Sequence, residues 1–467
     1  MPFKFIRHAT IPALWMTLVH AGLAQQAPID LPGAALHSSP VDDAPAADAS
    51  QDIVSERFAV HGQATFMEQV TAPFHAPYSG PNSLSSGQGA ETFDMTFFLG
   101  ARLWSGAEAW INPEIDQGFG LDNTLGVAGF PSGTAYKVGR SHPYWRLPRL
   151  FVRQTLDLGG DREPVEANAN QLGGPQSANR WVFTVGKISA SDIFDTNGYA
   201  HDPRNDFLNW TAVDAGTWDY AADSWGYSVG ALAEWYQGQW ALRAGVFDLS
   251  DVPNSETLDH GFHEFQWDGE LERRYVLKAM PGKLLMTVFD SRGRMGLLDQ
   301  AVSLAQATGL DVTTALVDVR RYRSRAGVSL SLEQQLTSDL GVFARAGKAG
   351  GNVEPYEFTD VDRTAVAGLS LTGKRWGRAG DTVGLAAIDN GISAAREQYL
   401  NAGGLGILVG DGKLPHPGAE QILETYYRLA VVQWAQLTLD YQYVINPAYN
   451  TDRGPVSIFA VRVHAQF

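Results

Sequence analysis

The C-terminal residues of the chain alternate strictly between two kinds of side chain. One face carries Phe459, Val461, Val463, Ala465 and Phe467, and the other carries Ala460, Arg462, His464 and Gln466. A period of two indicates a β-strand with one apolar face and not a helix. A final strand that ends in Phe predicts the closing strand of an outer-membrane β-barrel, and an ordinary edge strand is the alternative.

The same alternation recurs along most of the chain. Clear examples are the runs 93–103, 240–246, 326–333, 365–372 and 437–443. Counting such runs predicts an all-β fold, a transmembrane antiparallel barrel of about 16 strands, which is an even number within the bacterial range.

The connections between these runs also alternate. Short turns are expected near 104–105, 237–238, 281–282, 337–338, 377–380 and 433. Long links are expected near 72–91, 113–147, 188–224, 249–263, 291–320, 349–362, 391–419 and 446–455. Short periplasmic turns and long external loops favour a membrane barrel over a soluble sandwich. The link near 159–177 breaks the pattern, because it should be short and is long.

Apolar residues at helical spacing over 297–316 predict a short helix at the rim.

Two N-terminal segments precede the barrel in this interpretation. Residues 1–24 have the features of a cleaved signal peptide: Lys4 and Arg7, an apolar core over 11–23, and small residues before Gln25. Residues 25–55 are rich in Pro, Ala and Asp without periodicity, which predicts a disordered extension. The barrel is then expected over 56–467, in the outer membrane of a Gram-negative bacterium.

Composition excludes several function classes. The formal net charge of −16 argues against nucleic-acid binding, which needs a basic surface. The absence of cysteine excludes thiol catalysis and thiolate metal sites. The motifs GxSxG and HExxH do not occur, and the histidines make no recognisable catalytic set. We therefore expect no enzyme and no cofactor.

The face opposite the apolar one should line the lumen. Because a charge facing lipid costs ~2–4 kcal/mol at mid-membrane, charged residues of the strands are expected to point inward. The inward set includes Arg102, Arg153, Arg243, Arg345, Arg428 and Arg462, a ladder of Arg321, Arg323 and Arg325, and the acids Asp94, Asp157, Glu333, Glu424 and Asp440. This set predicts a water-filled, arginine-lined lumen. The alternative is that the arginines only neutralise lumen acids and stiffen the wall.

The segment 192–223 is the most distinctive loop. It combines hydrogen-bonding residues with aromatic ones: Asp192, Asp195, Asn197, Asp202, Arg204, Asn205 and Asn209 with Phe207, Trp210, Trp218 and Tyr220. Carboxylates and amides bind sugar hydroxyls, and flat aromatic faces stack on pyranose rings. Folded inward, this loop would narrow the pore. The alternative is an external loop with its own aromatic core.

Four long blocks support a more specific interpretation. The stretches 110–133, 135–155, 181–210 and 319–333 resemble the carbohydrate-selective, OprB-type porins, and the similarity spans roughly 57–467. The resemblance implies a barrel of 16 strands, passage of glucose and other small sugars, an arginine-bearing constriction and inward-folded loops.

The remaining partners follow from this interpretation. We expect contact with outer-membrane lipid and lipopolysaccharide, recognition of the Phe467 strand by the barrel-assembly machinery, and a monomer or homotrimer. The nearer functional alternative is an anion-preferring channel for sugar acids or other small organic acids, since an arginine-rich lumen attracts anions.

Overall fold

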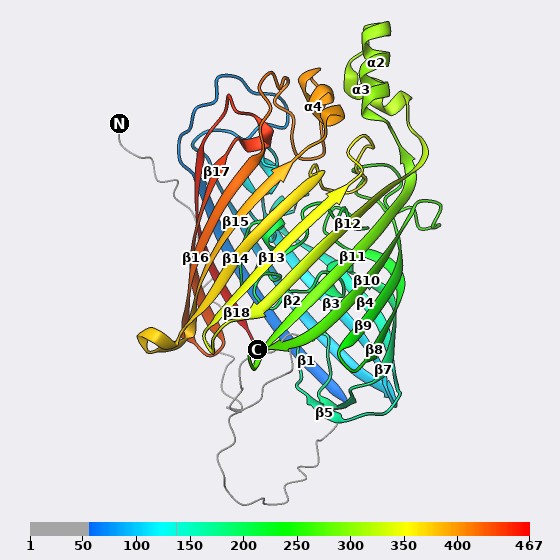
Figure 1. The fold of residues 1–467 in the computed structure, drawn as a ribbon, viewed down its shortest axis with the longest axis vertical. Helices are drawn as coiled ribbons and strands as arrows, with labels where there is room; N and C mark the ends of the chain where they lie inside the picture. Colours follow the sequence, from blue (N-terminus) through cyan, green and yellow to red (C-terminus); the bar gives the residue numbers. More distant parts are fainter. Residues whose placement is uncertain (1–55, 137) are drawn as a thin grey trace, which may run out of the picture. The chain divides into compact units, whose positions relative to one another are not determined.

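A computed structural model describes residues 56–136 and 138–467 of the chain. The predicted signal peptide (1–24) and disordered extension (25–55) lie outside the described residues. The described chain forms a closed antiparallel barrel of 16 strands, which confirms the predicted fold class (Figure 1). Among the described residues, no helix is long and apolar enough to cross a membrane.

The barrel strands follow one another in chain order around the ring. They are β1 (Phe58–Thr71), β2 (Gly89–Trp104), β3 (Ala107–Gly118), β4 (Arg140–Asp157), β7 (Arg180–Ile188), β8 (Ser228–Gln237), β9 (Trp240–Asp248), β10 (Phe265–Leu277), β11 (Met280–Met295), β12 (Arg321–Gln335), β13 (Leu340–Ala349), β14 (Arg363–Gly373), β15 (Arg378–Gly391), β16 (Glu420–Val432), β17 (Ala435–Ile445) and β18 (Val456–Gln466). Two further strands, β5 (Arg162–Val165) and β6 (Gly174–Ser177), make a separate hairpin. The helices are α1 (Trp210–Val213), α2 (Leu298–Thr308), α3 (Val312–Asp318) and α4 (Ala394–Asn401).

The first and last strands close the ring. β1 pairs with β18 over a register from Gln63 opposite Gln466 to Thr71 opposite Ile458. On β18, Phe459 is 50% exposed on the outer face, whereas Arg462 and His464 are buried inside. The C-terminal residues therefore form the predicted closing strand, with the apolar face outward and the polar face inward.

The two ends of the barrel differ as predicted, with two local corrections. Long loops and helices α2, α3 and α4 lie at one end, and the C-terminus lies at the other (Figure 1). The β10–β11 turn was expected at 281–282 but falls at Lys278 and Ala279, whose φ angles of 50° and 63° suit a tight type I′ hairpin. The single rim helix expected over 297–316 is two helices, α2 and α3, separated at Gly309, which adopts a φ of 75°.

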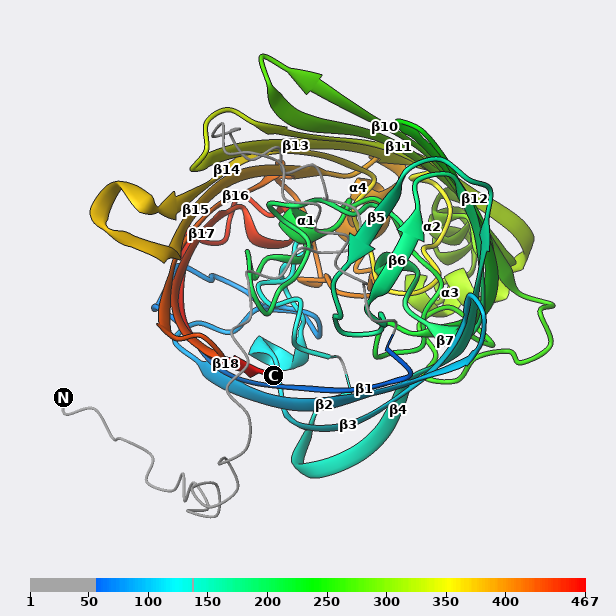
Figure 2. The same ribbon diagram turned by 90° about the horizontal axis from the view of Figure 1, so that it is seen from below.

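Loop segments fill much of the interior. Viewed along the barrel, α1 and its neighbouring loops lie inside the ring of strands (Figure 2). Phe194, Phe207 and Trp218 from this region are fully buried in apolar clusters shared with the inner wall. The wall is polar on its inner side as predicted, but much of that polar surface is covered by loops.

Candidate functional site

The loop 189–227 crosses the lumen and is bound to the opposite wall. Arg345 of β13 donates to the carbonyl oxygens of Ala212 (2.6 Å) and Ala200 (2.8 Å), and its Nε lies 3.1 Å from a carboxylate oxygen of Asp195. On β16, Glu424 accepts a hydrogen bond from the backbone N–H of Asn209 at 3.2 Å. The loop therefore folds inward, in the arrangement that the sequence suggested for a constriction.

One group of side chains, from strand β4 and from two loops, contains partly exposed arginines. We call it the arginine–tyrosine cluster and define it as Arg146, Arg149, Arg204, Tyr136 and Tyr227. The guanidinium carbon of Arg146 lies 4.5 Å from the Tyr136 ring centroid and 5.1 Å from that of Tyr227. The guanidinium carbon of Arg149 also lies close to Tyr227, 5.0 Å from its ring centroid. Burial raises the pKa of Tyr227, so its hydroxyl stays protonated and available for hydrogen bonding.

Carboxylates surround the cluster without fully enclosing it. Arg146 pairs with both Glu114 and Asp116 of β3. Arg204, from the loop, donates through Nε to Asp94 of β2 at 2.9 Å. Arg149 makes a two-pronged contact with Asp192 at 2.7 and 2.6 Å. A small cavity lined by Asp94, Asp116, Tyr136 and Tyr144 lies at this position. Acids and arginines thus alternate over a short distance.

A local irregularity in β4 places both wall arginines inward. On β3, Asn112 and Glu114 are two residues apart, but their partners on β4, Arg149 and Arg146, are three residues apart. The extra residue is accommodated at Pro148, since proline cannot complete the hydrogen-bond ladder and is found at bulges. The bulge switches the side-chain alternation, so two residues of opposite parity share the inner face.

Exposure distinguishes the three arginines of the cluster from the most deeply buried arginines of the interior. The side chains of Arg146, Arg149 and Arg204 are 11%, 15% and 15% exposed. In contrast, Arg325 and Arg345 have no exposed side-chain surface. Guanidinium groups with no exposed surface cannot contact a passing molecule.

Several predicted pore-lining arginines have structural partners. Arg243 is bound by three acids of the wall, Glu234, Glu270 and Glu272, at 2.6–3.2 Å. In the predicted ladder, Arg321 and Arg323 lie at the outer end of β12 and donate to backbone carbonyl groups. Arg102 and Arg153 lie at the opposite end and bind the 159–179 link.

The other predicted residues of the loop also fall into two groups, those that contact the arginine–tyrosine cluster and those that only hold the loop in place. Asp192 and Arg204 belong to the contacts of the arginine–tyrosine cluster. Asn197 donates to Ser331, Asp202 accepts from Arg204 N and Asn205, and Asn209 caps α1. Trp218 donates to Asp268 at 2.9 Å and is fully buried, and Trp210 stacks on Phe130 with 5.2 Å between ring centroids. These aromatic residues are packed in apolar clusters, Trp218 together with the wall residues Phe247 and Phe289. The loop therefore has neither freely exposed aromatic faces nor the separate external core of the alternative expectation.

Arg146, Arg149, Tyr136 and Tyr227 are not among the residues predicted from the sequence to line the pore. Strict alternation from Arg153 places Arg146 on the lipid face, where it would not have been chosen. Pro148 in the middle of a strand was the available signal of a bulge.

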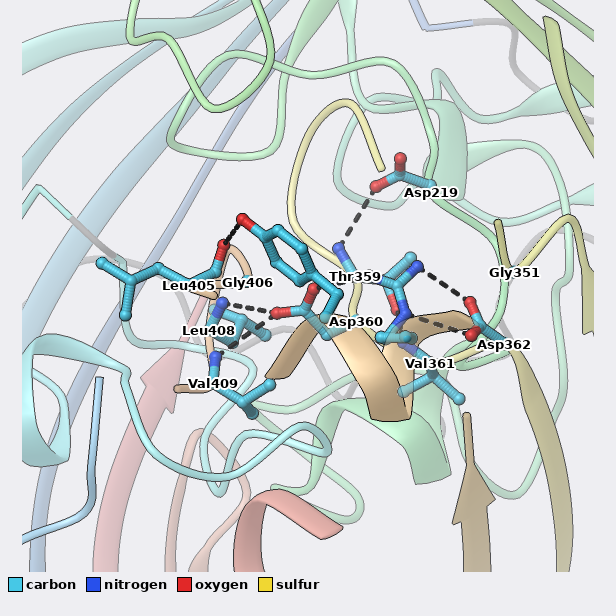
Figure 3. A network of polar contacts seen from close by, with 12 residues as sticks. Asp219, Gly351, Thr359, Asp360, Val361, Asp362, Leu405, Gly406, Leu408 and Val409 are labelled. Atoms are coloured by element: carbon cyan, nitrogen blue, oxygen red, sulfur yellow. Dashed lines mark hydrogen bonds and ion pairs between the residues drawn. The ribbon is translucent and has the colours of Figure 1, made fainter. Parts of the chain in front are cut away.

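A second polar network fastens the external loops (Figure 3). Arg396 of α4 donates to Asp362 at 3.0 and 2.9 Å and to Asp360 at 3.3 Å. Asp360 also accepts from the backbone N–H of Leu408 at 2.7 Å, and Asp219 accepts from that of Thr359 at 3.2 Å. The network joins three loops that follow β7, β13 and β15, so these external loops form one connected layer.

The docking of loop 189–227 should depend on pH. Burial raises the pKa of Asp195 from 3.8 to about 6, with Arg345 acting in the opposite direction. Since the docked loop binds a proton more tightly than the undocked loop, docking is weakened as pH rises from about 4 to about 6, by an amount of about 3 kcal/mol. Limited proteolysis at pH 4 and pH 7 spans this titration, and cleavage within 189–227 of the wild type should increase at pH 7 relative to cleavage of an unrelated protein under the same conditions. Asp195→Asn should lose this increase, and a variant with the same pH response as the wild type would contradict the assignment.

The fold and this site identify the general class of protein, and the family model then identifies the family. A closed barrel with an apolar outer face and inward-folded loops is a membrane channel of the porin class. The family model described as "Carbohydrate-selective porin, OprB family" matches residues 82–467, and the chain belongs to that family. Family and fold together indicate a channel-type protein of the outer membrane of Gram-negative bacteria.

Two solved structures are similar to this chain, and the first of them supports the fold. The high-pH structure of Pseudomonas putida OprB is similar with a TM-score of 0.66 and 14% identity, over 88% of this chain and 94% of that chain. The outer-membrane channel DcaP of Acinetobacter baumannii has a TM-score of 0.46 and 10% identity, over 88% of this chain and 97% of that chain. The comparison with curated protein sequences found no significant match.

Proposed function

We propose that the chain is a passive diffusion channel for small neutral carbohydrates, with the arginine–tyrosine cluster as a weak saturable site. The observation that carries the proposal is the partial exposure of Arg146, Arg149 and Arg204 beside tyrosine rings, in an interior where most other charged groups are buried. Membership of the carbohydrate-selective family supports the same substrate class.

The chemistry of the cluster suits a polyhydroxylated solute. A guanidinium fork donates to two neighbouring hydroxyl groups, and the paired carboxylates accept from others. Because arginines and acids lie side by side, the local field favours neutral polar molecules over either sign of ion, and weak binding lets the sugar leave.

An anion channel for sugar acids is the second candidate. Arg146, Arg149 and Arg204 would attract a carboxylate. The carboxylates of Glu114, Asp116, Asp94 and Asp192 count against it, since they neutralise these three arginines.

Liposome swelling separates the two candidates. We expect vesicles containing the refolded protein to swell rapidly in isosmotic glucose and more slowly in a disaccharide. Gluconate should enter more slowly than glucose. Faster uptake of gluconate than of glucose would move the assignment to the anion channel.

We also propose a lipid partner for the outer wall. Arg292 and Arg294 point outward at the external end of β11, and both side chains are exposed. On the same face Asp290 follows them, and the apolar residues Val288 and Met286 lie beyond it. Arg292 lies 5.8 Å from the ring centroid of the exposed Tyr322. This placement suits a phosphorylated headgroup such as that of lipopolysaccharide. Loss of copurifying lipid phosphate from an Arg292→Gln, Arg294→Gln variant would support it, and unchanged lipid phosphate would contradict it.

Recognition of the Phe467 strand by the assembly machinery stays a prediction.

A further inference from the structure

The link between β4 and β7 is an exception among the connections at its end of the barrel. The neighbouring turns there are tight, whereas residues 158–179 contain the β5–β6 hairpin. Seen from this end, β5 and β6 lie inside the outline of the barrel ring and not beside it (Figure 2). The chain therefore places a folded element across the periplasmic mouth, where porins ordinarily have short turns.

Two inner-wall arginines hold this hairpin in place. Arg153 of β4 donates to the carbonyl oxygen of Asn170 at 2.8 Å. Arg102 of β2 donates to the carbonyl oxygen of Glu56 at 2.8 Å and to that of Gly173 at 3.4 Å. Glu56 and Gly173 also bond to each other, through Glu56 N to Gly173 O at 3.2 Å and Gly173 N to the Glu56 carboxylate at 2.9 Å. Because Arg102 and Arg153 both hydrogen-bond to the link, we assign these two arginines a structural role and not a role in sugar binding.

The tip of the hairpin is also packed into the barrel. Leu172 is 3% exposed and belongs to the apolar cluster that contains Ala59, Trp110 and Phe151 from the inner faces of β1, β3 and β4. An apolar side chain buried at this position stabilises the inward arrangement by about 1.5–3 kcal/mol relative to exposure. By contrast, the outer part of the hairpin is exposed, including Arg162, which pairs with Asp157 at the surface.

We propose that residues 161–178 form a periplasmic flap that sets the size of solute the channel releases, latched by Arg102, Arg153 and Leu172. The flap narrows the exit on one side of the ring, below the arginine–tyrosine cluster. The wall needs no hairpin here for its own closure, because the ladder between β4 and β7 is continuous from Asp157–Arg180 to Leu150–Lys187. The inference rests on the proposed channel function and adds a second determinant of its selectivity.

The flap can be deleted without disturbing the ends of β4 and β7, because its two ends are already paired. Leu158 N already donates to Asn179 O at 3.0 Å, and Gly159 and Gly160 have φ angles of 87° and 91°. Removing residues 161–178 would leave Gly159 and Gly160 as a two-residue hairpin turn, for which positive φ at both positions is required. The variant should therefore close with a tight turn like its neighbours. A second variant, Arg102→Gln with Arg153→Gln, unlatches the flap without deleting it.

Single-channel recording of the refolded full chain tests the proposal. We expect the deletion to give a severalfold higher conductance and passage of saccharides that the wild type excludes, and the unlatched variant to fluctuate between the two conductance levels. Arg162→Gln is the matched control, because it makes the same chemical change on the exposed part of the flap, and its conductance should equal that of the wild type.

The outcomes distinguish the flap from the channel function. Heat-modifiable electrophoretic mobility first identifies folded barrels. Folded deletion variants with wild-type conductance and the same size limit would overturn the flap. If the wild type and all variants conduct salt without any response to sugar, the proposed sugar function is wrong. A difference in conductance between the wild type and the deletion variant would still support the flap in that case.

Discussion

Replacing Arg146 by glutamine is expected to weaken the block of ionic current by glucose by roughly tenfold. A hydrogen bond to a charged group contributes about 1.5–3 kcal/mol, and about 1.4 kcal/mol corresponds to a factor of ten in affinity. Arg146 supplies such a donor between Glu114, Asp116 and the Tyr136 ring. The substitution also removes one positive charge beside two carboxylates, so reversal potentials in a salt gradient should shift toward cation preference.

The control for this variant is Arg273→Gln. Arg273 lies on the outer face near one end of β10, with its guanidinium carbon 4.6 Å from the ring centroid of the exposed Trp240. The Arg273→Gln substitution makes the same chemical change as Arg146→Gln at a position that does not face the lumen. Glucose block and ion preference should therefore stay as in the wild type. Equal glucose block in Arg146→Gln and wild type would remove the arginine–tyrosine cluster from the account.

Replacing Arg345 by alanine is expected to release the loop 189–227 from the barrel wall. Arg345 binds Asp195, Ala200 and Ala212 together, and its side chain is fully buried. Removing one partner of a buried ion pair costs about 3–5 kcal/mol, because the other charge is left uncompensated. The loop should become sensitive to protease, and the conductance should rise with added noise as the lumen loses its constriction.

The neighbouring strand provides a control for the Arg345 variant. Arg323 of β12 donates to the carbonyl oxygens of Met295 and Val319 at the outer rim and makes no contact with the loop 189–227 among the described residues. Arg323→Ala should therefore leave cleavage within 189–227 unchanged. A loop that stays protected in Arg345→Ala would show that the other anchors, such as Glu424, suffice to hold it.

The sequence predicted the barrel well because the bilayer imposes a simple rule on each strand. Every second side chain must be apolar, so the alternation over 459–467 and the inward positions of Arg243, Arg345 and Arg462 followed from periodicity alone. The closing contact between β1 and β18 follows from the same requirement, since an open sheet edge cannot face lipid.

The site was much harder to predict, because it depends on non-periodic features. The bulge at Pro148 reverses the parity of β4, so strict alternation placed Arg146 outside. Periodicity also could not tell a reachable arginine from one covered by a loop, as Arg146 and Arg325 show. The flap was visible only as an unexplained long link, since its inward packing through Leu172 is a tertiary contact.

Selection of neutral sugars by a weak site in the lumen can be measured on single channels. The measurement is the conductance of the refolded protein in a planar bilayer, titrated separately with glucose and with gluconate. We expect open channels whose current is blocked saturably by glucose and less by gluconate. A current that is blocked by gluconate alone, or that shows no response to glucose at any concentration, would rule out the proposed site.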